Sequence, residues 1–263
     1  LTFQPVLDNN WHGNVSVLIF TGFCLSYFLL RKNWNFSSGL ALGLLLPLKF
    51  YPAIFIPYFI WKKNWRLVGG ALMGCLLIGL LSLLTVGGEG LLAYFEMFRG
   101  EVGGGGFAAF NNQSLTGFLL HLFDFGNVNV WRNTAVPFWL TGLRLAGALI
   151  LALAAVGAMI REPKENEPAE SVRDLDLSLL ILVMLLASPI TWYHYYTWLI
   201  FPLYCLIDRL LREWRVGTAD LLLLAIGYGL VAVQGIDVIR PFAAEAIDRV
   251  RLLRLLLSQS FIG

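Results

Sequence analysis

Long apolar runs that do not alternate limit what this chain can fold into more than any other feature. The runs LLIGLLSLL (76–84) and LSLLILVMLLA (177–187) lack the apolar–polar alternation of a transmembrane β-strand. Hydrophobic residues make up 58% of the chain and charged residues only 14%, against about 25% charged residues in a soluble domain. Several runs approach the roughly 17–25 apolar residues that cross a bilayer as a helix. We therefore predict an all-α, polytopic transmembrane helical bundle with about seven to eight membrane segments.

Candidate membrane segments and the loops between them divide the chain. The candidate segments are 15–30, 37–61, 67–86, 136–160, 175–190, 193–207 and 219–239. Between them we predict a long outer loop at 87–135 and a charged loop at 161–176. The tail 240–263 carries arginines among leucines, which is typical of an amphipathic helix at the membrane interface. We treat 1–263 as one membrane-embedded domain. Because the chain begins without Met or a basic leader, we expect it to be the C-terminal part of a longer protein.

Basic residues suggest how the segments are oriented, because cytoplasmic loops collect Lys and Arg. Segment 37–61 has basic residues on both sides, so it either crosses the membrane once or forms a hairpin broken at Pro47 and Pro52. Leaving out the tail, a hairpin places eleven basic residues inside (31, 32, 62, 63, 66, 161, 164, 173, 209, 212 and 215) and two outside (99 and 132). A single crossing gives nine and four, so the sequence favours the hairpin.

Lys49 lies at the expected apex of this hairpin, in LLPLKFYPAIF (45–55). Each arm of the hairpin spans about 18–22 Å, so the apex is expected below the outer membrane surface, at a water-filled depression. An ionisable residue inside a membrane segment is by default a candidate functional group. One interpretation is that Lys49 binds a phosphate or pyrophosphate. The other is that it extends its ammonium group to the lipid headgroups.

His194 lies in the aromatic turn SPITWYHYYTW (188–198). One interpretation is a band of aromatic residues at the membrane interface with a passive histidine. The other is a histidine at the outer mouth of a site, which contacts an anionic group or shares a proton with a substrate. In that case Trp192 and Tyr195 would stack on a sugar or flank a lipid tail.

Two polar stretches add further candidate side chains. DNNWHGNVS (8–16) holds His12 and Asn14, which either bind a polar ligand or cap the helix that follows. GEVGGGGFAAFNNQSLTGFLLHLF (100–123) begins with glycines that suggest a mobile outer loop. In that stretch Asn111, Asn112, Gln113 and Ser114 precede an apolar helix, as a cap or as part of a loop that closes over a sugar.

Other chemistries have no support in the sequence. The three cysteines lie in apolar segments without a CxxC pair, which is typical of buried small side chains. The glycine-rich stretch lacks the Gly-Lys-Ser/Thr ending of a P-loop, the three histidines lack metal-ligand spacing, and no G-x-S-x-G motif of serine hydrolases is present. We therefore expect no metal and no cofactor. The net charge of +2 gives no indication of a nucleic-acid partner, and we expect none.

Four stretches in order resemble glycosyltransferase family 87, the mannosyltransferase-like membrane enzymes of the GT-C superfamily. They are GNVS (13–16), SSGLALGLLLPLKFYPAIF (37–55) with KKNWR after it, NNQSLTGFLLHLF (111–123) and SPITWYHYYTWLIFP (188–202). The Ser-Pro-x-x-Trp-x-His turn is the best single match. Two positions depart from the family. GNVS stands where many members have Gly-Gln-x-Asn, and His121 stands where an Arg often follows.

The resemblance implies a GT-C-like fold and a defined reaction. A polyprenyl phosphate carries an activated sugar on the outer face, an acceptor hydroxyl attacks the anomeric carbon with inversion, and the lipid phosphate departs. The general base of the family is an aspartate in the first outer loop, which we expect upstream of residue 1. We therefore do not assign that role to any acid here, including Asp8, Glu89, Glu96, Glu101 and Asp124.

The resemblance also implies roles for residues of this chain. Lys49 and His194 would bind the donor phosphate, with His194 as a second candidate for catalysis. The residues expected to bind the sugar or the acceptor are His12, Asn14, Asn111, Asn112, Gln113, Trp192 and Tyr195.

The expected partners are a polyprenyl-phosphate-linked sugar, with mannose as the first candidate, a lipid or glycan acceptor, and the lipids of the plasma (inner) membrane. Two alternatives stay open. One is a transporter or flippase of lipid-linked saccharides, which would use the same polar pocket. The other is a non-catalytic polytopic membrane protein, in which Lys49 and His194 are structural.

Overall fold

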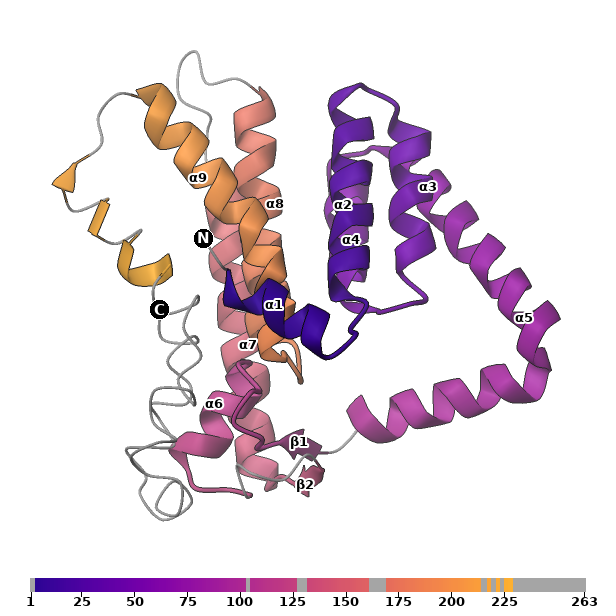
Figure 1. Cartoon of the computed structure of the whole chain (residues 1–263), viewed down its shortest axis with the longest axis vertical. Coiled ribbons are helices and arrows are strands. Elements are labelled where there is room, and N and C mark those ends of the chain that lie inside the picture. Colours follow the sequence, from indigo (N-terminus) through magenta and orange to yellow (C-terminus); the bar gives the residue numbers. More distant parts are fainter. Residues whose placement is uncertain are drawn as a thin grey trace. The chain divides into compact units, whose positions relative to one another are not determined.

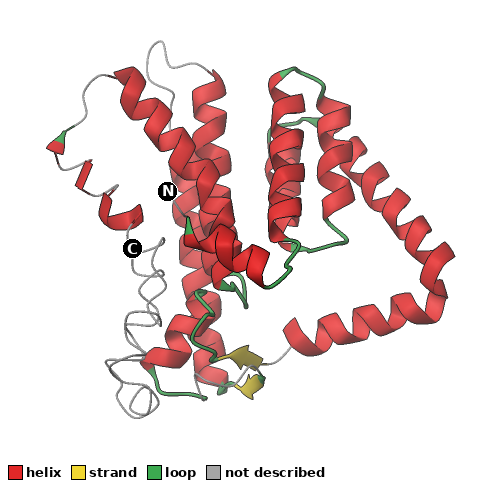
Figure 2. Ribbon diagram, viewed as in Figure 1, coloured by secondary structure: helices red, strands yellow, loops and turns green. Residues whose placement is uncertain are grey.

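The computed structural model describes residues 3–102, 105–126, 132–160, 169–213, 217–218, 221–222 and 225–228. Within these ranges the chain is almost entirely helical (Figure 2), which confirms the prediction of an all-α protein. The strands of the described residues are a short antiparallel pair, β1 (Gly105–Phe107) and β2 (Asn133–Ala135). The predicted tail 240–263 and most of segment 219–239 lie outside the described residues.

The chain divides into two compact units, which we describe separately. The first unit consists of residues 1–14 and 104–263, and the second consists of residues 15–103. The predicted single domain therefore contains two centres of packing.

The second unit is built from four helices and one 3₁₀ turn. They are α2 (Ser16–Arg31), α3 (Asn35–Leu45), η1 (Tyr51–Ile54), α4 (Phe55–Trp61) and α5 (Trp65–Val102). Helix α3 packs against both α2 and α5 (Figure 1). Helices α2 and α4 meet through Phe23 and Phe55, whose rings are stacked with centroids 5.0 Å apart.

The chain reverses within segment 37–61, as the hairpin interpretation predicts. The side-chain amide of Asn64, just after α4, donates a hydrogen bond of 3.1 Å to Oδ1 of Asn35 at the start of α3. The two ends of the segment therefore lie together. The reversal falls at 46–54, where Pro47 and Pro52 interrupt helical hydrogen bonding and Pro52 is the second residue of the 3₁₀ turn.

The two basic turns of this unit share one backbone motif. Asn33 and Lys63 follow the ends of α2 and α4 with φ angles of 60° and 56°, the left-handed conformation that ends many helices. In each turn the next backbone N–H bonds back to the last helical turn: Trp34 to Leu29 at 2.9 Å, and Asn64 to Phe59 at 2.9 Å. The turns satisfy helix-end carbonyls and direct the following helix back along the one before.

Small residues allow α3 and α5 to pack with their backbones nearly in contact. A Cβ atom at Gly39 would overlap the backbone carbonyl of Leu67, and one at Gly43 would overlap that of Ala71. Gly70 and Gly74 on α5 face the backbone of α3 in the same way. In an apolar solvent such close contact is a main source of helix association, because lipid removes the usual hydrophobic driving force.

Helix α5 bends sharply at Gly87 (Figure 1), where φ is 71° and ψ is 177°. The sequence predicts that segment 67–86 ends at this point, but a second helical part follows the bend and continues to Val102. The stretch 87–135 is therefore not one irregular loop. It also contains β1, β2 and the helix α6 (Leu115–Leu122). Its position outside the membrane stays a prediction.

The first unit contains the remaining helices: α1 (Gln4–Trp11), α6, α7 (Phe138–Met159), α8 (Ala169–Ala187) and α9 (Ile200–Glu213), with the 3₁₀ segment η2 (Tyr193–Leu199). Helix α8 packs against α7 and α9, and α1 packs on η2. Helices α6 and α7 share a small core with the stretch after β1, formed by the buried residues Ala108, Leu119, Leu120 and Leu140.

Two of the described helices are long and apolar enough to cross a membrane: Trp65–Met97 and Phe138–Met159. Their apolar side chains are largely exposed, since only 28% and 11% of the most apolar window of each helix is buried. A soluble protein would cover such surface. Helices α2, α3 and η1–α4 are apolar but shorter, so the count of seven to eight segments stays a prediction.

We expect Gly87→Ala to destabilise the second unit by about 1–3 kcal/mol, because a side chain is strained at this backbone conformation. The neighbouring Gly88→Ala is the matched control. A Cβ added at either position would meet no described atom within 4 Å, and of the two only Gly87 has a positive φ. Thermal unfolding in detergent measures both variants. Equal melting temperatures would contradict the strain at Gly87.

We expect Gly43→Ala to separate α3 from α5 and to cost about 1–3 kcal/mol, as overpacking does elsewhere. The control is Gly69→Ala, since a Cβ at Gly69 meets no atom of the described residues within 4 Å. Chemical unfolding in mixed micelles compares the two variants. A Gly43→Ala protein as stable as Gly69→Ala would show that the helices do not depend on this contact.

Candidate functional site

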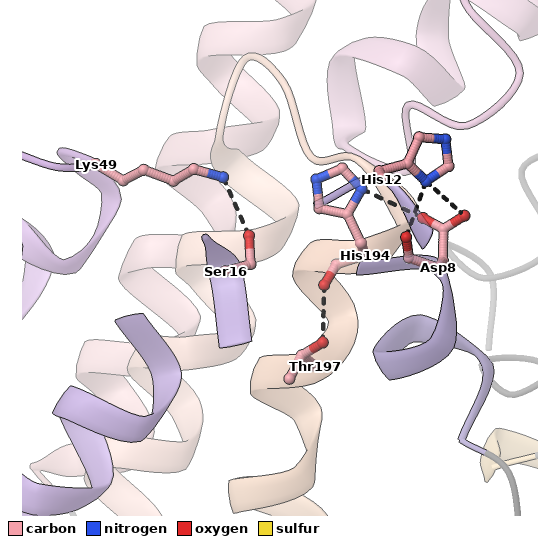
Figure 3. Close-up of polar contacts among 6 residues, drawn as sticks. All are labelled: Asp8, His12, Ser16, Lys49, His194 and Thr197. Carbon is pink, nitrogen blue, oxygen red and sulfur yellow. Dashed lines mark hydrogen bonds and ion pairs between the residues drawn. The ribbon is translucent and has the colours of Figure 1, made fainter. Parts of the chain in front are cut away.

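Asp8 and His194, which are far apart in sequence, meet in the first unit (Figure 3). Helix α1 supplies Asp8 and η2 supplies His194, and Asp8 Oδ2 lies 3.3 Å from His194 Nδ1. The side chains are 12% and 8% exposed respectively. His194 Nε2 is buried and makes no hydrogen bond within the described part of the chain. One nitrogen of this buried imidazole contacts a carboxylate, and the other lacks a hydrogen-bond partner among the described residues. Buried polar atoms are usually hydrogen-bonded, so the second nitrogen is a candidate to bind a ligand.

His12 joins this pair at the end of α1. Its Nδ1 lies 2.8 Å from the backbone oxygen of Asp8 and 3.4 Å from Asp8 Oδ1, and its ring centroid lies 6.1 Å from that of His194. The His12 side chain is 54% exposed, so it is open to a ligand. We refer to Asp8, His12 and His194 as the Asp–His cluster.

The stretch 8–16 contains the end of one helix and the start of the next. Residues 4–11 are themselves helical, with Pro5 in the first turn, where its missing N–H costs nothing. Helix α2 then begins at Ser16, and the Val15 side chain at its N-cap position makes no capping hydrogen bond. Half-buried Asn14 has its N–H bonded at 3.0 Å to the carbonyl of Asn9, which turns the chain after α1. The roles expected for His12 and Asn14, as ligand-binding or capping residues, stay predictions.

The aromatic turn is held in place by the stretch 111–113. The N–H of Gln113 bonds to the carbonyl of Thr191 at 2.7 Å, and the N–H of Tyr193 bonds to the carbonyl of Asn111 at 3.0 Å. Asn112 and Trp192 thus form an antiparallel bridge. Two of the predicted site segments are therefore one paired structure.

Asn112 lies fully buried at the centre of this pairing. Its Oδ1 accepts hydrogen bonds from the N–H of Thr191 at 2.9 Å and from the N–H of Ser114 at 3.3 Å. Its Nδ2 donates to the carbonyl of Phe107 at 2.8 Å. Both ends of the amide group are engaged inside the protein, so Asn112 anchors the turn.

Ser114 completes the junction as the N-cap of α6, because its Oγ accepts a hydrogen bond from the N–H of Gly117. The capping alternative for this stretch is thus confirmed. His121 on α6 is also structural: it is fully buried, and its Nε2 lies 2.9 Å from the carbonyl of Ala108.

The aromatic residues of the turn fall into two groups. Tyr193, Tyr196 and Trp198 are almost completely buried and belong to the core. The hydroxyl of Tyr196 donates to the carbonyl of Gln113 at 3.0 Å. Trp192 and Tyr195 are only half-buried. These two are the aromatic rings of the turn that retain surface for a ligand.

Lys49 lies in the second unit, in the reversal between α3 and η1. Its Nζ donates a 3.0 Å hydrogen bond to Oγ of the buried Ser16, at the start of α2 (Figure 3), and lies 5.8 Å from the centre of the Tyr51 ring. The hydroxyl of Tyr94 on the second part of α5 bonds to the carbonyl of Pro47 at 3.2 Å. The half-buried ammonium group is therefore directed towards an internal hydroxyl.

Sequence reasoning missed two residues of these clusters. The sequence assigns Asp8 no role, although its i, i+4 spacing to His12 would place both on one helix face. Ser16 belongs to the quoted GNVS stretch, but no local signal links it to Lys49, 33 residues away.

We expect Asn112→Ala to lower the free energy of unfolding of the first unit by about 1–3 kcal/mol, because it leaves buried backbone groups unsatisfied. The control Asn10→Ala removes the same type of side chain at an exposed position of α1. Hydrogen exchange of the Thr191 amide reports the change locally. Unchanged protection of that amide in Asn112→Ala would contradict the anchoring role.

Comparison with known proteins identifies a family for this chain. No curated protein and no solved structure matches the chain. The family described as glycosyltransferase family 87 matches residues 1–189, well over half of the 263 residues. The match covers Asp8, His12 and Lys49 and ends at residue 189, within the aromatic turn and before His194. The chain therefore belongs to glycosyltransferase family 87.

Proposed function

We propose that this glycosyltransferase moves a sugar from a polyprenyl-phosphate donor to a lipid or glycan acceptor at the outer face of the plasma membrane, with inversion at the anomeric carbon. Membership of the family establishes the transferase class. The family and the two long apolar helices indicate a membrane protein. The donor type, the acceptor, mannose as the sugar and the multi-pass topology are our proposal.

The observation that carries this proposal is the placement of Lys49. An ammonium group among apolar helices costs free energy unless an anion or hydrogen-bond acceptors surround it. In the structure Nζ has the neutral hydroxyl of Ser16 as one such acceptor. An anionic phosphate would be a much stronger partner, because charge-assisted hydrogen bonds are about twice as strong as neutral ones.

The proposed reaction gives this charge a specific use. When the acceptor oxygen attacks the anomeric carbon, the bond between that carbon and the phosphate oxygen breaks, and the electron pair leaves on the phosphate. Negative charge therefore grows on the leaving group in the transition state. A fixed cation in a site with little water stabilises that charge most effectively. This arrangement requires no metal ion.

Sugar and acceptor groups would be bound by residues with remaining surface. We assign this role to His12, Asn14, Trp192 and Tyr195, which are half-buried or exposed. Half-buried Asn111 would contribute from the edge of the paired turn. Gln113, which the sequence also suggested, is buried, and its Nε2 donates to the carbonyl of Phe110 at 2.9 Å, so it supports the turn from inside. Asn112 supports these neighbours without touching the sugar, since its amide is already used internally.

We expect Lys49→Met to lower the rate of sugar transfer by roughly 10²–10³-fold, the scale of removing one transition-state donor. Lys49→Arg should retain part of the rate because it keeps the charge. The control is Lys62→Met, at the opposite end of the hairpin, where Nζ lies 4.8 Å from the Trp61 ring. The assay uses protein expressed from its full gene in nanodiscs, radiolabelled polyprenyl-phosphate-mannose or the corresponding arabinofuranose donor, and native lipid extract.

The alternatives predict other results. A non-catalytic membrane protein would give no labelled product with either donor. A flippase would move the donor across a liposome membrane without forming product. Full transfer activity in Lys49→Met, with normal membrane insertion, would remove Lys49 from the mechanism.

A further inference from the structure

The two ring nitrogens of His194 have different surroundings. Nδ1 lies 3.3 Å from the Asp8 carboxylate, and Nε2 is buried without a hydrogen-bond partner among the described residues. The residue as a whole is only 6% exposed. Water therefore has little access to Nε2 in this structure, and the described side chains around it leave the nitrogen unsatisfied.

The surroundings of the ring fix its orientation. The hydroxyl of Thr197 donates to the carbonyl of His194 at 2.9 Å, which holds the backbone of η2 at this point. The Tyr195 ring lies edge-on to the imidazole, with centroids 4.9 Å apart. The ring is thus held by its backbone, by a neighbouring ring and by the carboxylate.

Elementary hydrogen-bond chemistry then determines the tautomer. An ionised carboxylate only accepts hydrogen bonds, so the Asp8 contact requires a hydrogen on Nδ1. In a neutral imidazole the other nitrogen then carries a lone pair. A buried lone pair needs a donor, and a sugar or acceptor hydroxyl supplies one. A phosphate oxygen does not, because it is itself an acceptor.

We propose that Asp8 is a positioning residue that holds His194 as the Nδ1–H tautomer, so that Nε2 accepts the hydrogen bond of a substrate hydroxyl. This rests on the proposed function, because the hydroxyl belongs to the transferred sugar or to the acceptor. It revises the role that the sequence suggested for His194, from a phosphate ligand to a hydroxyl ligand. Lys49 keeps the phosphate role.

The first test needs no substrate. The protein is labelled with ¹⁵N-histidine in nanodiscs, and His194→Asn identifies the His194 resonances by their loss. We expect the shift pattern of a neutral ring protonated at Nδ1. Asp8→Asn should move a large fraction of His194 to the Nε2–H tautomer, and Asp8→Glu should restore the native pattern. An Nε2–H ring in the unmodified protein, or an unchanged tautomer in Asp8→Asn, would overturn the proposal.

The second test uses the transfer assay. Asp8→Asn should lower kcat at least tenfold and leave KM for polyprenyl-phosphate-mannose within twofold, with partial recovery in Asp8→Glu. Glu89→Gln, which neutralises an exposed acid on α5, is the control. A purely structural role would lower the melting temperature without moving the tautomer.

The kinetic results also identify the source of the hydroxyl. If Asp8→Asn needs a higher lipid-extract concentration for half-maximal rate than the unmodified protein, the hydroxyl belongs to the acceptor. If Asp8→Asn loses kcat alone, at saturating lipid extract, the hydroxyl belongs to the transferred sugar. If Asp8→Asn raises both KM for the donor and the inhibition constant of sugar-free polyprenyl phosphate, then His194 binds phosphate and the proposal is overturned. An inactive unmodified protein would refute the proposed function while the ¹⁵N result stands by itself.

Discussion

Hydrogen bonding of polar groups inside an apolar helical protein is the constraint on which the rest of this structure depends. Where helices are interrupted, the freed backbone groups need partners that neither lipid nor apolar side chains supply. The protein meets this need by pairing the stretch around Asn112 with the turn after α8, and by joining the ends of the hairpin through Asn35 and Asn64. The irregular segments are therefore ordered rather than loose.

Close packing of small residues has a complementary role in the second unit. Glycines on α3 and α5 bring the backbones of these two helices together. The reversal at 46–54 therefore follows directly on a tightly packed helix pair. Lys49 projects from that reversal to Ser16 at the beginning of α2. A cation held in place stabilises the charge of a transition state better than a mobile one, because the protein does not have to reorganise during the reaction.

The Asp–His cluster follows the same logic in the first unit. The pairing at Asn112 fixes the turn that carries His194, and α1 brings Asp8 to one of its nitrogens. The carboxylate satisfies that nitrogen and thereby specifies what the other one can bind. In a glycosyltransferase, whose substrates present many hydroxyl groups, a fixed acceptor of this kind selects orientation as well as binding.

The family match and the structure agree with much of what the sequence indicates locally. The helices, the reversal near Pro47 and Pro52, and the cap at Ser114 were all predictable, because each depends on residues close together in the chain. The bend at Gly87 was visible only as a pair of glycines, which by itself equally suits the end of a helix. Within the predicted outer loop 87–135, the helix after Gln113 was expected, whereas the second helical part of α5 was not.

The sequence by itself determined an apolar helical protein with a lysine in a segment broken by two prolines, since composition and prolines act locally on backbone conformation. Only the tertiary structure decided which side chains meet. Asp8 and His194 are 186 residues apart, and Asn112 reaches across 79 residues to Thr191. Contacts at such separations arise from packing of whole elements, so no local pattern distinguishes an amide that anchors a turn from one that is free to bind a sugar.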